Sequence, residues 1–388
     1  MNLFFYYTAF ATGTLAGSSF LYSVVIFSQT LEGGRGFSGL VFLFLFLPFP
    51  LIFLYTGYLL DRFSKKWVLL VFQSLHLLAS LSIFLFESEI RNLPYLLLGV
   101  AFMNGIGMTT VLPGRMAILK EITEPHRLVF HTIAGNLLLI FSFGMSPLAV
   151  GYLRESLDYT ETFSVISAFH AFSIVSFLFL RPKSVHKEIW TKPETGLVLR
   201  FLGSDQVARQ VLYVTVLSML ALGPIQVLLP KYIRDILGLG ELARGAVLVA
   251  LGPGLFLGGF LTILFHHWER KGLILLSMLI LSAIFFLGFV PFSSSTFTSV
   301  FLFCFGLSGG VLTSLLPAIL QKRAEDSIRG RILSLYTVCF QFTPAVSGFI
   351  SAVLGDNIGI VETFYVFGMG ITAAALIGFF HYSELRKF

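Results

Sequence analysis

Uncharged polar side chains occur at helical spacing along several otherwise apolar stretches. Thr8, Thr12 and Ser19 fall on one helical stripe, with Tyr22 beside them. Hydroxyl groups in this pattern could bind a solute without forming an ion pair. The structural alternative is hydrogen bonding between packed helices, typically worth about 0.6–2 kcal/mol per contact, and we favour it for any single Ser or Thr.

Comparable polar positions occur in five further stretches. For three of the amides, Asn104, Asn136 and Gln341, we favour a functional role because an unpaired amide in apolar surroundings is costly. The candidate substrate-binding residues are Thr12, Ser19, Tyr22, Asn104, Asn136, Ser218, Gln226, Ser308, Thr337 and Gln341.

Titratable side chains are scarce in the same stretches. No Asp, Glu, Lys or Arg falls in the central part of any of them, which argues against a proton antiporter working through a buried carboxylate. Arg115, near one end of its stretch, is expected to anchor that end or to touch an anionic head group. His76 and His170 are expected to be neutral side chains bonded to a neighbouring helix, and His131 is a candidate proton sensor.

Twelve apolar stretches position these residues. Hydrocarbon about 30 Å thick requires roughly 20 apolar residues of helix. Apolar residues make up 56% of the chain and Asp, Glu, Lys and Arg 12%, whereas a soluble domain has about 25% charged residues. The sequence predicts an all-α membrane protein with transmembrane helices at approximately 3–29, 37–60, 67–87, 93–114, 128–151, 161–181, 209–230, 243–266, 272–292, 297–320, 331–354 and 361–382.

Charge is distributed unequally among the loops. The net charge is +6, but Lys and Arg concentrate on one side of the predicted membrane while acids divide evenly. The positive-inside rule then places both termini in the cytoplasm of a multi-pass protein of the bacterial inner (plasma) membrane. The basic balance therefore reflects topology and does not predict a nucleic-acid partner.

The chain divides into two halves. We predict an N-terminal six-helix bundle at 1–181, a cytoplasmic linker at 182–208 and a C-terminal six-helix bundle at 209–388. The linker is expected to be a solvated tether, although 197–202 could lie along the inner leaflet. Three short patterns recur after about 200 residues, for example Ser146-Pro147 and Thr343-Pro344. Two such pseudo-symmetric halves are typical of secondary transporters.

The loop after the second predicted helix contains the most specific motif. The residues Gly57, Asp61, Arg62, Lys65 and Lys66 stand at the spacing G-x-x-x-D-R-x-x-[RK]-[RK]. This stretch resembles the signature of the major facilitator superfamily (MFS). The Arg329-Gly330-Arg331 segment is similar to the branch of bacterial exporters for siderophores and macrolides.

The resemblance implies a gating latch. The carboxylate of Asp61 would face the start of the eleventh helix near Arg329 and Arg331, at a helix N-terminus that attracts anions. Simple positive-inside anchoring is the alternative for Arg62, Lys65 and Lys66. The resemblance also implies a central cavity lined by helices 1, 4, 7 and 10, with help from 2, 5, 8 and 11. The segment Ser146-Pro147-x-x-Val150-Gly151 resembles an antiporter motif in which two small residues are replaced.

Pairs of glycines at G-x-x-x-G spacing, such as Gly254/Gly258 and Gly306/Gly310, are expected to serve packing inside a bundle.

We therefore expect a secondary transporter that moves a small, amphipathic, largely uncharged molecule by alternating access, with export as the favoured direction. The alternatives are a lysophospholipid transporter, an uptake permease for a neutral solute, and a non-transporting sensor or scaffold. No catalytic motif, metal site or cofactor site is predicted, so the chain is not expected to be an enzyme. Its expected partners are the substrate and membrane lipids, and it is expected to be a monomer.

Overall fold

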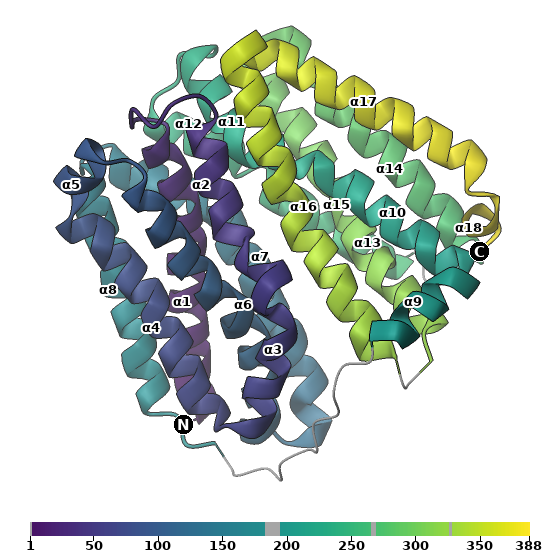
Figure 1. Cartoon of the computed structure of the whole chain (residues 1–388), viewed down its shortest axis with the longest axis horizontal. Helices are drawn as coiled ribbons and strands as arrows, with labels where there is room; N and C mark the ends of the chain where they lie inside the picture. The colour runs from purple at the N-terminus through teal and green to yellow at the C-terminus, as the bar shows by residue number, and fades with distance from the viewer. Residues whose placement is uncertain (1, 183–194, 265–268, 326–327) are drawn as a thin grey trace. The chain divides into compact units, whose positions relative to one another are not determined.

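The structure is a computed structural model that describes residues 2–182, 195–264, 269–325 and 328–388. Every regular element in these ranges is a helix (Figure 1). Within the described ranges, eleven helices or helix pairs are long and apolar enough to cross a membrane, and a bent pair can make a twelfth. Helices satisfy their own backbone hydrogen bonds, as a lipid environment requires. The predicted all-α fold class is confirmed.

Packing divides the chain into two compact units. Unit 1 comprises residues 1–191 and 240–246, and unit 2 comprises 192–239 and 247–388. The short α12 (Glu241–Leu248) therefore contributes its first residues to unit 1. The predicted boundaries at 181 and 209 stay a prediction, and residues 183–194 of the predicted linker lie outside the described residues.

The packing of unit 1 centres on the helices labelled α1 and α4. Helix α1 packs against α7 and α8, and α4 packs against α6 and α8. In chain order these helices are α1 (Asn2–Ser28), α2 (Phe37–Phe46), α3 (Pro48–Arg62), α4 (Lys65–Leu85), α5 (Glu87–Asn92), α6 (Leu96–Ile122), α7 (Leu128–Arg154) and α8 (Tyr159–Leu178).

The second predicted span is interrupted. The break between α2 and α3 falls at Leu47, directly before Pro48, and Pro50 follows. Proline has no backbone N–H and disfavours a continuous helix. The pair is further bent by 62° between Phe53 and Tyr55. One continuous helix over 37–60 is therefore not what the structure shows.

Unit 2 repeats the packing order of unit 1. The pair α14 and α15 corresponds to α4 and α6, and α14 with α17 corresponds to α4 with α8. This agreement supports the sequence repeat. The helices are α9 (Thr195–Ser204), α10 (Gln206–Leu220), α11 (Leu222–Asp235), α13 (Leu251–Leu264), α14 (Lys271–Gly288), α15 (Ser295–Arg323), α16 (Arg329–Ile358), α17 (Ile360–His381) and α18 (Ser383–Lys387).

Glycines allow the closest helix pair of unit 2, α13 with α15. A Cβ at Gly258 would lie 2.0 Å from the Leu307 carbonyl oxygen, and one at Gly310 would lie 2.2 Å from that of Leu255. Gly254 and Gly306 are equally crowded by backbone of the opposite helix. The prediction that these glycines pack helices inside a bundle is confirmed.

The end of the linker is folded rather than solvated. Val198 of α9 is buried in the core of unit 2, and Phe201 and Leu202 pack against that core. Asp205 then caps α10 by accepting a hydrogen bond from Ala208 N at 2.9 Å. The expectation of a solvated tether does not hold for Val198, Phe201 and Leu202, whose side chains pack in the core of unit 2, whereas Arg200, Gly203 and Ser204 are exposed.

Candidate functional site

The α3–α4 loop holds the predicted gating motif. Asp61 is half-buried near the end of α3, and Arg62 is exposed. The Arg62 guanidinium donates to the Tyr58 hydroxyl and lies 5.5 Å from the centre of its ring. This contact keeps the arginine along its own helix.

The two lysines of the motif join helices of unit 1. Lys65 Nζ lies 2.6 Å from Glu121 Oε1 of α6. Lys66 Nζ donates to the carbonyl oxygens of Leu178 and Leu180, at 2.6 and 2.8 Å. A cation at the last carbonyls of α8 is favoured by the helix dipole. Both lysines therefore connect α4 to neighbouring helices, a structural role that simple positive-inside anchoring does not include.

Gly57 has open space around it within unit 1. A Cβ built on this residue meets no heavy atom within 4 Å, and the gating role of Gly57 stays a prediction. Arg329 and Arg331 begin α16 in unit 2, and Arg329 Nε donates to the Gln321 carbonyl at 3.2 Å. Asp61 belongs to unit 1, and its pairing with these arginines stays a prediction.

The predicted substrate residues of unit 1 have different environments. Thr12 is half-buried, and its hydroxyl donates to the Thr8 carbonyl of the same helix at 2.8 Å. Ser19 is buried and Asn136 is exposed. Asn104 is 1% exposed, with Oδ1 at 2.7 Å from His76 Nδ1. The Asn104 geometry favours interhelical bonding over substrate binding.

Tyr22 faces a residue that sequence reasoning missed. The side chain of Arg244, from α12, is 1% exposed, interacts electrostatically with Tyr22 and forms an ion pair with Glu241. All three residues belong to unit 1. Arg244 lies close to the predicted end of its span, and nothing in the local sequence distinguishes it from an anchoring residue.

The predicted residues of unit 2 are mostly bonded within their own helices. The hydroxyls of Ser218, Ser308 and Thr337 donate to the carbonyls of Thr215, Cys304 and Leu333, at 2.9, 3.1 and 2.8 Å. Gln341 is half-buried. The Gln226 Oε1 atom is buried and has no partner among the described residues, which leaves an acceptor available.

Arg115 is placed where neither expectation put it. It is 2% exposed, inside unit 1, about two helical turns before the end of α6. Its Nη2 donates to Gln73 Oε1 at 3.0 Å, and its guanidinium lies 5.0 Å from the ring of Phe10. Gly13 provides the space, because a Cβ there would lie 2.3 Å from Arg115 Nη2. Both the anchoring and the head-group expectation are wrong.

The histidines bond to other helices. His76 of α4 bonds to Asn104 of α6, and His170 Nδ1 of α8 lies 3.1 Å from Gln73 Nε2 of α4. These contacts agree with the expected hydrogen bonding to a neighbouring helix. His131, the candidate proton sensor, is 8% exposed, and its Nδ1 lies 2.7 Å from the Tyr7 hydroxyl. Its role stays a prediction.

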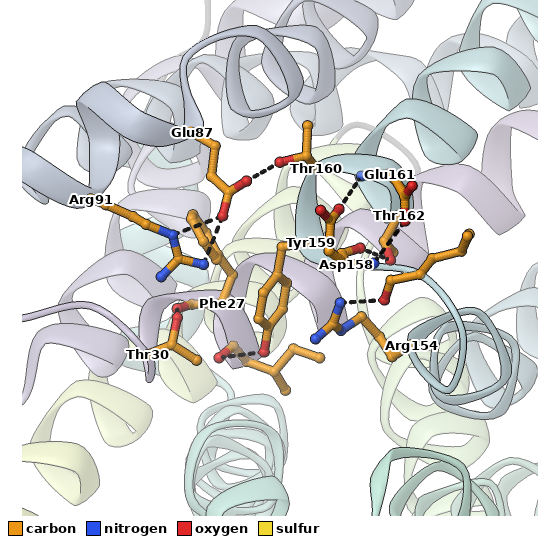
Figure 2. Close-up of polar contacts among 12 residues, drawn as sticks. Phe27, Thr30, Glu87, Arg91, Arg154, Asp158, Tyr159, Thr160, Glu161 and Thr162 are labelled. Atoms are coloured by element: carbon orange, nitrogen blue, oxygen red, sulfur yellow. Dashed lines mark hydrogen bonds and ion pairs between the residues drawn. The ribbon is translucent and has the colours of Figure 1, made fainter.

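A second polar cluster, the α5-end cluster, lies at the end of unit 1 that carries α5. It consists of Phe27, Glu87, Arg91, Arg154, Tyr159 and Thr160. Figure 2 shows Glu87 between Arg91 and Thr160, with the Arg91 Nη2 to Glu87 Oε1 distance at 2.7 Å. Arg154 lies 3.9 Å from the centre of the Tyr159 ring. Asp158 and Glu161 form a capping box at the start of α8. These contacts connect the ends of neighbouring helices, which indicates a structural role for the cluster.

Comparison with known proteins defines the class. Residues 4–348 match the model of the Major Facilitator Superfamily, and the chain belongs to this family. It is 27% identical over 349 residues to an uncharacterized MFS-type transporter, YuxJ, of Bacillus subtilis (strain 168), which covers 84% of this chain and 82% of the relative. It is 22% identical over 375 residues to macrolide efflux protein A of Streptococcus pyogenes, with 94% and 92% covered.

Solved structures share the fold. A point mutant of the nucleoside transporter NupG matches with a TM-score of 0.79 and 13% identity, over 99% of both chains. A D-xylose–proton symporter matches with a TM-score of 0.77 and 12% identity, over 97% of both chains. The chain is thus a multi-pass membrane transporter and not an enzyme. Transporters of this family bind small-molecule substrates and commonly work as monomers.

Proposed function

We propose that this chain exports a small, amphipathic, largely uncharged compound from the bacterial cytoplasm by alternating access. The observation that carries the proposal is the scarcity of buried carboxylates. Among the described residues, Asp205 is the single carboxylate in the buried class, and it caps α10 and pairs with Arg323 at 2.6 Å. A site without a free buried acid is suited to hydroxyl, ether and carbonyl groups.

The binding residues would be neutral. Gln226 Oε1 is a buried acceptor without a partner among the described residues, so a substrate hydroxyl could satisfy it. The half-buried Gln341 and Thr12 and the exposed Asn136 would add further hydrogen bonds. The likeness to a macrolide efflux protein over 94% of this chain supports export and a substrate of this chemical class.

The gate would be the predicted latch. Asp61 would attract the N-terminal end of α16, near Arg329 and Arg331, in the state that is closed on the cytoplasmic side. The support is the loop motif itself, together with the lysines that hold α4 rigidly to α6 and α8.

Transport by purified protein in liposomes tests both parts, with labelled erythromycin as the probe. We expect saturable uptake that Asp61→Asn slows strongly while the apparent Tm stays unchanged. The matched control is Glu124→Gln, an acid at the same end of unit 1 whose side chain is 67% exposed. Full activity of Asp61→Asn would remove the latch, and an absence of erythromycin uptake by the wild-type protein would remove the macrolide class.

The same liposomes separate the alternatives. A lysophospholipid transporter would move a fluorescent lysophospholipid between leaflets and leave erythromycin behind. A protein inserted in one orientation shows the direction of transport. Reporter fusions at both chain ends test the cytoplasmic termini, which the positive-inside distribution predicts. His131→Gln is expected to change the pH dependence of transport, and an unchanged pH profile would exclude its sensing role.

A further inference from the structure

Inside unit 1, four polar side chains from three helices form a line of contacts. Arg115 of α6 donates to Gln73 of α4, and Gln73 in turn contacts His170 of α8. The ring of His76 stacks on that of His170, with centres 5.5 Å apart and planes 9° from parallel. His76, Gln73, Arg115 and His170 are all at most 5% exposed.

The donors and acceptors in this line fix one arrangement. A guanidinium can only donate, so the Gln73 atom 3.0 Å from Arg115 Nη2 must be the acceptor Oε1. The other end of the amide, Nε2, then faces His170 Nδ1 at 3.1 Å and must donate. His170 Nδ1 therefore carries a lone pair, and the ring proton is on Nε2. Arg115 thus holds His170 neutral through the orientation of one amide.

Among the described residues, the groups that act electrostatically on His170 provide no negative charge. The charged or titratable side chains facing it are Arg115 from α6 and His76 from α4, and Tyr6 of α1 lies beside Arg115. His170 Nε2 is buried and has no hydrogen-bond partner among the described residues. The neutral arrangement therefore already contains one unsatisfied donor, so it is not a fully satisfied structural network.

We propose that His170 is a proton-binding site of the transport cycle, and that proton binding there excludes the Gln73–Arg115 hydrogen bond. A proton added to the Nδ1 lone pair creates an N–H that faces the Gln73 NH₂ group. The amide must then turn over, so that Oε1 accepts from His170 and Nε2 faces Arg115. The guanidinium loses the Gln73 acceptor and keeps the Phe10 carbonyl, and the charge of the site rises by one. No other bond forms or breaks.

Loss of the Gln73 hydrogen bond would change the contacts of Arg115 with α1. The guanidinium lies against the Gly13 backbone and the Phe10 ring, and Tyr6 donates to the Arg115 carbonyl at 3.3 Å. The same helix carries Thr12, Ser19 and Tyr22, which are predicted to bind substrate. Proton binding at His170 would in this way change a substrate-binding helix. This role in coupling rests on the proposed transport function, whereas the proton site itself does not.

Nitrogen NMR of the full chain in lipid nanodiscs tests the proton site directly, with ¹⁵N-histidine and the His170 signal assigned by His170→Gln. At neutral pH we expect an unprotonated Nδ1 and a protonated Nε2. In Gln73→Glu, a carboxylate accepts from both Arg115 and His170, so His170 should carry two protons. In the control Gln73→Met, His170 should stay neutral. A protonated Nδ1 in the wild type, or a neutral His170 in Gln73→Glu, would overturn the proposal.

A titration of the wild-type protein covers the case in which Gln73→Glu does not fold. As pH falls, the Gln73 side-chain amide and the Arg115 guanidinium signals should change at the same pH as His170. Changes at a different pH would show that the groups are not linked and would contradict the mechanism.

Transport assays test coupling, again with labelled erythromycin in proteoliposomes. His170→Gln cannot take up a proton, so it should keep exchange at equal pH on both sides but lose the stimulation by a pH gradient. Stimulation equal to the wild type would overturn the role in coupling. If the wild type moves no erythromycin, the proposed function fails for that substrate, while the NMR result still decides the proton site.

Discussion

Two clusters of unit 1 stabilise an arginine side chain in different ways. In the α5-end cluster, Arg91 pairs with a carboxylate, Glu87, and is 43% exposed. Arg115 lies inside the unit at 2% exposure, and its hydrogen-bond acceptors are neutral oxygens of Gln73 and Phe10. In the first arrangement, next to loops, Arg91 is paired with a carboxylate, whereas in the second the charge of Arg115 is balanced by dipoles and aromatic faces.

The difference separates a structural contact from a poised one. Paired charges at helix ends contribute little and tolerate change. A charge within a membrane helix bundle is expensive, and such residues usually mark functional positions. Arg115 thus has a property that the α5-end cluster lacks: one turned amide changes its bonding. The following predictions test that contrast, beginning with the largest effect.

Gly13→Val should be the most damaging of these substitutions. The new side chain would collide with Arg115 Nη2 and Ser173 Oγ, which lie 2.3 and 2.6 Å from the site of a Cβ. We expect a loss of about 3 kcal/mol of unfolding free energy, read as a clear drop in apparent Tm. The control is Gly17→Ala on the same helix, where a Cβ meets nothing within 4 Å. Equal Tm values for the two variants would show that Arg115 does not occupy the space beside Gly13.

Gln73→Leu should rank second. It removes the acceptor of a buried charged donor, at a cost of about 1.5–3 kcal/mol. Adding Arg115→Met should recover most of this loss, because both partners are then apolar. A double-mutant cycle on apparent Tm measures the coupling. Strictly additive losses would mean that the two side chains do not depend on one another.

Arg154→Ala in the α5-end cluster should have a smaller effect. It removes a contact between a cation and an aromatic ring, worth about 0.5–2 kcal/mol. Tyr159→Phe retains the ring face and should have less effect on thermal stability than Tyr159→Leu. If these two variants were equally destabilised, the ring face would not be the stabilising partner of Arg154.

Glu87→Gln should change stability least. The ion pair with Arg91 is partly exposed, so about 0.2–1 kcal/mol is expected. High salt should reduce the difference from the wild type, because screening weakens exposed pairs. A loss as large as that of Gln73→Leu would erase the contrast between the two clusters.

The sequence predicted the fold well because lipid imposes a strict length and polarity rule on each span. It also predicted interhelical bonds for His76 and His170. The prediction for Arg115 was wrong. Its position near the end of the predicted span indicated an exposed side chain, but the side chain is buried because Gly13, which has no Cβ, leaves space for it. The sequence also favoured substrate binding for Asn104; the hydrogen bond to His76 favours an interhelical contact, and the substrate role stays a prediction.

The error at Arg115 has a general cause, which is that apolar patterns do not show which face of a membrane helix is buried. In a soluble helix, apolar residues mark the face that packs inside. In a membrane helix, lipid and protein interior are both apolar, so the pattern does not show which face is buried. The break at Leu47 could have been predicted from the sequence, because Pro48 and Pro50 interrupt the second predicted span.

Competition binding to the purified protein tests whether the substrate site lacks a counter-acid. Labelled erythromycin carries a basic amine on one of its sugars, and its sugar-free aglycone is neutral. We predict that the neutral aglycone displaces erythromycin, because binding relies on hydroxyl and carbonyl groups. Failure of the aglycone to compete, with binding that requires the protonated amine, would contradict it and point to a carboxylate in the site.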